Sequence, residues 1–135
     1  MNEALENFVG AGITAKGGLQ FALEVMHFLR KKLLEFQKET GHFYNLEATP
    51  AEGASYRLAM LDSKKYPFIT TAGEDAPYYT NSTQLPADYT DDIFEVMELQ
   101  EELQSLYTGG TVCHIYLGEC IEDISVCKNI IRKIF

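Results

Sequence analysis

The stretch from Asn45 to Leu85 reads NLEATPAEGASYRLAMLDSKKYPFITTAGEDAPYYTNSTQL and decides the expected fold. At its start, the pattern predicts a short strand over His42–Ala48, then a tight loop and a helix that ends near Asp62. The remainder is rich in proline, glycine and aromatic residues and offers only short strands, around Phe68–Thr71 and Tyr78–Thr80. A strand that leads through a loop into a helix is typical of α/β proteins.

Helical periodicity predicts further helices on both sides of this stretch. They are expected over Asn2–Gly12, from Gly17 to a stop at Gly41, after the capping signal Thr90-Asp91-Asp92, and over Ile121–Ile134. One more strand is expected over Thr111–Leu117, which is rich in β-prone residues. The alternation of helices and strands indicates an α/β fold with a parallel component, in which residues 1–135 form a single unit.

Length and charge narrow the classes of protein. The chain has 135 residues, 46% of them hydrophobic, which suits one globular domain. Its formal charge of −9 argues against binding to nucleic acid or to an anionic membrane. A nucleotide remains possible, since one phosphate needs only a few local amides. No apolar run approaches the ~20 residues that span a bilayer, and no leader opens the chain. We therefore expect a cytoplasmic protein.

The three cysteines predict neither disulfides nor a metal site. Cys113, Cys120 and Cys127 are odd in number and form no CxxC pair. We expect reduced, structural thiols, with Cys113 buried in its strand and therefore inert. His114 should point to the opposite face of that strand, in a structural role. No residue is predicted to be catalytic or to bind a metal.

The loop Thr49-Pro50-Ala51-Glu52-Gly53-Ala54-Ser55 has two interpretations. In the structural one, Thr49 caps the following helix, Pro50 takes its first position and Glu52 completes a capping box. In the functional one, the helix start holds a phosphate on its unpaired amides. Gly53 would then allow close approach, the Ser55 hydroxyl would donate a hydrogen bond, and Arg57 would neutralise part of a polyphosphate.

Four blocks of the sequence resemble the large catalytic subunit of the anaerobic ribonucleoside-triphosphate reductases, which are glycyl-radical enzymes. The blocks are NLEATPAEG, YYTNSTQLP, TDD and YTGGTV, at residues 45–53, 78–86, 90–92 and 107–112. They stand in the family's order and spacing, and the resemblance extends more weakly over nearly the whole chain. Those catalytic cores are several hundred residues long, so the chain looks like a fragment of one.

The resemblance implies a substrate site. Pro50-Ala51-Glu52 is similar to the loop that binds the substrate's phosphates in ribonucleotide reductases, with Glu52 in the role of orienting the loop. The candidate phosphate contacts carried over are Thr49, Ala51, Glu52, Gly53, Ala54 and Ser55. The segment that contains Asn81 and Ser82 would line the mouth of the active site. Gly109 and Gly110 would let the backbone approach a ribose or a base.

The resemblance also implies a fold and a reaction. The fold would be part of a ten-stranded α/β barrel of the ribonucleotide reductase type, incomplete in this chain. The reaction replaces the 2′-hydroxyl of a ribonucleoside triphosphate with hydrogen. It uses a thiyl radical and a glycyl radical, which a separate activating enzyme installs with S-adenosylmethionine and an iron–sulfur cluster. The regulatory nucleotide domain, the cysteine loop, the zinc site and the glycyl-radical segment are missing from these 135 residues.

Three hypotheses follow for the biological role. The chain is a fragment of a reductase, a non-catalytic nucleotide-binding or assembly module derived from one, or one part of a split enzyme. Its partners would be a ribonucleoside triphosphate, the remaining segments of the reductase or a second copy of itself, and the activating enzyme of the parent. Alone, it should dimerise, rearrange its strands or be only marginally stable, because a partial barrel leaves strand edges and apolar helix faces uncovered.

Overall fold

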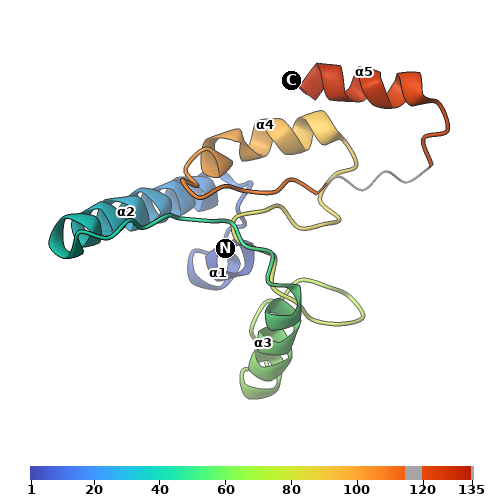
Figure 1. The fold of residues 1–135 in the computed structure, drawn as a ribbon. Coiled ribbons are helices and arrows are strands. Elements are labelled where there is room, and N and C mark those ends of the chain that lie inside the picture. The colour runs from blue at the N-terminus through green and yellow to red at the C-terminus, as the bar shows by residue number, and fades with distance from the viewer. Residues whose placement is uncertain (115–119, 135) are drawn as a thin grey trace.

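The computed structural model describes residues 1–114 and 120–134, and Figure 1 shows their course. Within these residues the regular structure consists of five helices. They are α1 (Asn2–Phe8), α2 (Lys16–Thr40), α3 (Glu52–Lys65), α4 (Ile93–Gln104) and α5 (Ile124–Ile134). Each falls where the sequence predicted a helix. The predicted stop of α2 is also confirmed, because Gly41 caps it in the left-handed conformation at φ 73°.

The prediction of an α/β fold is wrong for the described residues, which contain no strand and no sheet. The segments expected as strands make only two isolated bridges, a parallel one between Glu47 and Gly110 and an antiparallel one between Ala72 and Tyr78. Residues 115–117 of the expected last strand lie outside the described part. The described chain is therefore not part of an α/β barrel. A strand requires a hydrogen-bonded neighbour, and these β-prone segments have none beyond single bridges.

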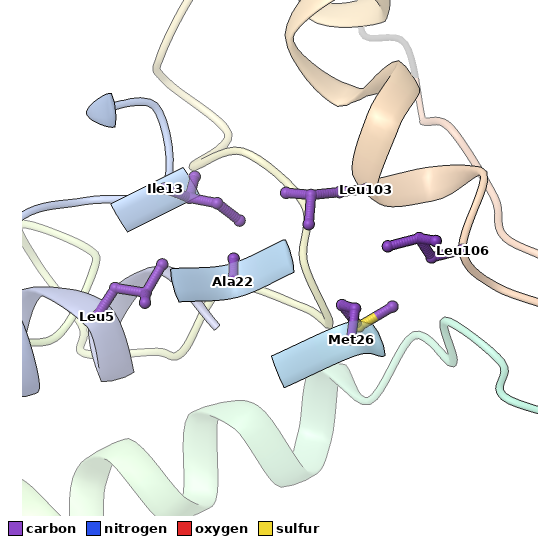
Figure 2. Packing of buried hydrophobic residues seen from close by; sticks show 6 residues of the cluster. All are labelled: Leu5, Ile13, Ala22, Met26, Leu103 and Leu106. Atoms are coloured by element: carbon purple, nitrogen blue, oxygen red, sulfur yellow. The ribbon is translucent and has the colours of Figure 1, made fainter. Parts of the chain in front are cut away.

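A small hydrophobic core joins three of the helices. It consists of Leu5 from α1, Ile13 from the following loop, Ala22 and Met26 from α2, Leu103 at the end of α4 and Leu106 just beyond it (Figure 2). The helix pairs that pack are α1 with α2 and α2 with α4. The segment after Gly41 then runs back along α2 and leads into α3 (Figure 1).

The rest of the molecule is open. Ala59 is the only buried residue of α3, and no residue of α5 is buried. The chain exposes 9802 Å² to solvent. A compact monomer of 15.2 kDa would expose about 7,100 Å². Large apolar side chains on the surface include Phe68, which is 99% exposed, and Phe43, which is 89% exposed. In the part of the chain that the structure describes, no helix has the length and apolar character needed to cross a membrane.

Candidate functional site

A cavity of about 360 Å³ lies beside the first turn of α3. We call it the α3 cavity. Three segments that are far apart in the sequence form its wall. The first runs from Ala48 into the start of α3, the second covers residues 78–87, and the third covers residues 112–114. The lining residues are Ala48, Pro50, Glu52, Ser55, Tyr78, Tyr79, Thr80, Asn81, Ser82, Gln84, Leu85, Ala87, Val112 and His114.

The start of α3 differs from the predicted cap. The helix begins at Glu52, and its N-cap is Ala51 in a non-helical conformation, with no side-chain cap. The predictions that Thr49 caps the helix, that Pro50 opens it and that Glu52 completes a capping box are therefore wrong. The physical reason is that Asn81 Oδ1 accepts the amide proton of Ala51 at 3.3 Å, so the chain turns into the helix two residues later.

This start leaves unpaired donors. The first intrahelical bond runs from the Ser55 amide to the Ala51 carbonyl at 2.7 Å. The amides of Glu52, Gly53 and Ala54 precede it and have no acceptor within the helix. A Cβ added at Gly53 would meet no atom within 4 Å, so the space in front of this turn is open. Such a helix end attracts anions through its amides and its partial positive charge.

Hydrogen bonds join the α3 turn to the Tyr78–Gln84 segment. The Ser55 hydroxyl donates to the Tyr79 carbonyl and accepts the Tyr79 amide proton at 3.1 Å. The Ser82 hydroxyl reaches the Thr49 carbonyl at 3.5 Å, the outer limit for such a bond. Together with the bond from Ala51 to Asn81, these contacts hold the two motifs against each other. For Ser55 to donate to a phosphate, its bond to the Tyr79 carbonyl would have to be released.

Side chains of helix α1 contact Thr80 in this segment and Thr70, which precedes it. Glu3 is 2% exposed, and its carboxylate accepts the Thr80 amide at 3.0 Å and the Thr80 hydroxyl at 2.5 Å. Asn7 pairs with Thr70 through two bonds of 2.9 Å, one in each direction. Sequence reasoning missed Glu3, because an acidic residue near the start of a polar helix gives no sign that it is buried.

Tyr79 has a further contact that ties it to α3. Its hydroxyl donates to Asp62 Oδ2 at 2.8 Å. Burial, and then the hydrogen bond to the Asp62 carboxylate, raise the pKa of the Tyr79 hydroxyl to about 12. Tyr79 is therefore protonated at neutral pH and serves as a hydrogen-bond donor.

The predicted glycine pair lies against the Asn45–Ala48 segment. The Gly109 amide donates to the Leu46 carbonyl at 2.7 Å, and the Ala48 amide donates to the Gly110 carbonyl at 3.0 Å. A Cβ at Gly109 would come within 3.0 Å of the Asn45 side chain, and Gly110 has a φ of 112°. Neither glycine lines the α3 cavity. Their contact with a ribose or a base stays a prediction.

Residues 111–114 separate two cavities. Val112 and His114 line the α3 cavity, whereas Thr111 and Cys113 line a second one of about 390 Å³ beside α4. This alternation agrees with the prediction that His114 and Cys113 point to opposite sides. The predicted burial of Cys113 is wrong: the thiol is exposed, because no neighbouring strand covers the segment.

The electrostatics of the α3 cavity are set by few groups. Of the residues that the structure describes, Glu52 is the one carboxylate that lines the cavity, and no lysine or arginine lines it. Arg57 is exposed on α3 and does not line the cavity. Of the predicted contacts, Glu52, Ser55, Asn81 and Ser82 line the cavity. Thr49, Ala51, Gly53, Ala54 and Arg57 flank them in the sequence. A phosphate here would be held by backbone amides. In the described part of the chain, no three metal-binding side chains gather.

Comparison with known proteins identifies the family. The family model of the anaerobic ribonucleoside-triphosphate reductases matches residues 1–135. The chain belongs to this family.

Three relatives named anaerobic ribonucleoside-triphosphate reductase show how much of such a protein the chain represents. The protein of Haemophilus influenzae is 29% identical over 92 residues, which are 68% of this chain and 13% of that protein. The protein of Enterobacteria phage T4 is 27% identical over 102 residues, 76% of this chain and 17% of the phage protein. The Escherichia coli protein is 26% identical over 95 residues, 68% of this chain and 13% of that protein. The chain thus matches only a small part of the length of its relatives.

Proposed function

We propose that this chain is a fragment of an anaerobic ribonucleoside-triphosphate reductase and supplies the part that binds the substrate's phosphates. The complete enzyme would reduce ribonucleoside triphosphates to 2′-deoxyribonucleoside triphosphates. The observation that carries the proposal is the uncapped start of α3, whose first-turn amides lie beside the α3 cavity. The small share of its relatives that the chain matches supports the fragment.

The proposed binding depends on the backbone of α3. Unpaired amides of Glu52, Gly53 and Ala54 would donate to phosphate oxygens, and charge-assisted bonds of this kind are stronger than neutral ones. The missing side chain of Gly53 allows an oxygen to reach the amides. The carboxylate of Glu52 would repel phosphate, so its role is to orient the loop. Arg57, one and a half turns into the helix, would neutralise part of the charge.

The radical chemistry would come from outside this chain. By resemblance, the complete enzyme needs a thiyl radical, a glycyl radical and the activating enzyme that uses S-adenosylmethionine and an iron–sulfur cluster. We expect no turnover from the isolated chain, and we propose that it binds a ribonucleoside triphosphate and the remaining segments of the reductase.

A second candidate function is a non-catalytic nucleotide-binding or assembly module derived from the reductase. The large apolar side chains on the surface, among them Phe43 and Phe68, favour it, because they offer an apolar surface to a partner. The two candidates differ in turnover. A reductase fragment should restore deoxyribonucleotide formation when it is combined with the remaining, activated segments, whereas a module should bind nucleotide without restoring it.

The experiment that tests the proposal is calorimetric titration of the chain with CTP, ATP and inorganic triphosphate. The test variant is Gly53→Ala and the matched control is Gly17→Ala. Both glycines are the second residue of a helix, and a Cβ at either would meet no atom within 4 Å. Gly53→Ala should weaken the binding of all three ligands by about tenfold. The added methyl group would keep the charged phosphate from hydrogen bonding to the first-turn amides.

The control variant should bind as the parent does. Equal affinity of Gly53→Ala and Gly17→Ala would exclude the α3 turn as the phosphate site. Absence of binding by a folded, monodisperse chain would show that these residues alone do not form the site.

A further inference from the structure

A separate cavity of about 200 Å³ lies between the second half of α2 and the segment that runs back along it. We call it the Arg30 cavity. Its polar lining residues come from three places in the chain: Arg30 and Gln37 from α2, Tyr44 and Asn45 from the returning segment, and Thr108 from the loop after α4. It shares no lining residue with the α3 cavity.

Most of the side-chain donors in this cavity are unused, although the Tyr44 hydroxyl shares a hydrogen bond with the Thr40 hydroxyl at 3.1 Å. Within the described residues, the side chains of Arg30, Gln37 and Asn45 make no hydrogen bond and no ion pair. The Thr108 hydroxyl accepts the Leu46 amide proton at 3.0 Å, so its own proton is available. Arg30 alone brings five N–H donors in a planar fork, the geometry that matches phosphate and carboxylate oxygens.

The charge of the cavity is unusual for this chain. There are 20 acidic and 11 basic residues in the chain, yet among the described residues no carboxylate lines the Arg30 cavity. The α3 cavity contains Glu52, and the cavity beside α4 contains Glu98 and Glu101. Arg30 is also half-buried, and partial burial strengthens its attraction for an anion.

We propose that the Arg30 cavity binds one phosphate group, either inorganic phosphate or the terminal phosphate of a small molecule. The guanidinium of Arg30 would donate hydrogen bonds to two phosphate oxygens. The side-chain amides of Gln37 and Asn45 and the Thr108 hydroxyl would donate to the other oxygens. The volume of about 200 Å³ admits a phosphate group and leaves the rest of a larger ligand outside. The site is independent of the proposed reductase function, because it uses α2 and not α3.

The test is a nuclear magnetic resonance titration of the chain with inorganic phosphate, followed at the side-chain amides of Asn45 and Gln37. A second titration with CTP distinguishes a free phosphate from one carried by a nucleotide. The test variant is Arg30→Gln, and the matched control is Arg132→Gln on α5. Both remove one positive charge, and neither side chain makes a hydrogen bond or an ion pair within the described residues.

Phosphate should shift both amides to saturation, and Arg30→Gln should weaken this binding about tenfold, because a charged hydrogen-bond donor is lost. Arg132→Gln and Gly53→Ala should leave these shifts unchanged. The proposal is wrong if the two amides do not move in the folded chain, or if they move equally in Arg30→Gln. Should Arg30→Gln not fold, Arg30→Lys decides: a folded variant that binds as tightly as the parent would overturn the role of the fork.

The Gly53→Ala titration separates this site from the proposed reductase function. Phosphate-induced shifts that Gly53→Ala removes only at the α3 turn bear on the reductase proposal. Phosphate-induced shifts that Arg30→Gln removes only at Asn45 and Gln37 bear on the Arg30 cavity.

Discussion

At the scale of single residues, Glu3 has a structural role near the candidate site. Its buried carboxylate accepts two hydrogen bonds from Thr80 and so fixes the segment that lines the α3 cavity. In Glu3→Gln, an amide group would replace one acceptor oxygen with a donor that faces other donors. We expect the free energy of unfolding to fall by about 1.5–3 kcal/mol.

Urea denaturation measures this change. Glu102→Gln on the exposed face of α4 is the control, and it should alter stability by less than about 0.5 kcal/mol. Equal effects of the two substitutions would show that the Glu3 contacts with Thr80 do not stabilise the chain.

Tyr79 gives the molecule a pH dependence at alkaline pH. The pKa of its hydroxyl rises from 10.0 to about 12 on folding. Below pH 10 both states hold the proton, so the stabilisation from the Tyr79 contact is fully present and does not change with pH. Between pH 10 and 12 only the folded state holds it, so stability falls as the pH rises. Ultraviolet titration of tyrosinate should show that Tyr79→Phe removes the component that titrates last. An unchanged titration curve would contradict the contact with Asp62.

Single residues also show how far the candidate site could be predicted from the sequence. The resemblance predicted that the segment with Asn81 and Ser82 lines the mouth of an active site, and both residues line the α3 cavity. Their hydrogen-bond partners were not predictable, since Asn81 accepts the amide proton of Ala51, which lies 30 residues earlier in the sequence. The same contact displaced the predicted cap at Thr49. A local capping signal competes with any distant acceptor, and sequence alone does not rank the two.

At the scale of elements, the start of α4 is a confirmed prediction with a measurable consequence. Asp92 is the N-cap, and its carboxylate accepts the amide protons of Phe94 at 2.8 Å and Glu95 at 3.4 Å. Asp92→Ala should destabilise the chain by about 1 kcal/mol.

Thermal unfolding followed by circular dichroism tests the cap. Asp91→Ala is the matched control, because the neighbouring Asp91 is equally charged and exposed but caps nothing. A loss of the same size in both variants would assign the effect to charge alone.

Helices were predictable and strands were not, for one physical reason. The apolar spacing along α2, with Ala22 and Met26 both buried, is a local property that the sequence displays directly. A strand depends on a neighbour that lies elsewhere in the chain. The Asn45–Ala48 segment finds only a single bridge to Gly110, so its β-prone residues form no sheet.

At the scale of the whole molecule, stability should be concentrated in the small core. Leu103 is fully buried between α4 and α2, whereas Ile131 on α5 is 51% exposed. Leu103→Ala should lower the free energy of unfolding by about 2–5 kcal/mol. Ile131→Ala should change it by less than about 0.5 kcal/mol, as for other surface positions.

Chemical denaturation of both variants gives the comparison. A large loss of stability in Ile131→Ala would show that α5 packs against another part of the chain in solution. That result would also reduce the apolar area available to a partner.

If the first turn of α3 binds phosphate, its own backbone amides should respond to the ligand. The most direct test is a titration of the isotope-labelled chain with inorganic triphosphate, in which the backbone amide resonances are followed residue by residue. We expect the amides of Glu52, Gly53 and Ala54 to shift most, and the same shifts in Gly53→Ala to need about tenfold more ligand. Saturable binding that leaves these three amides unmoved would contradict a phosphate site at this turn.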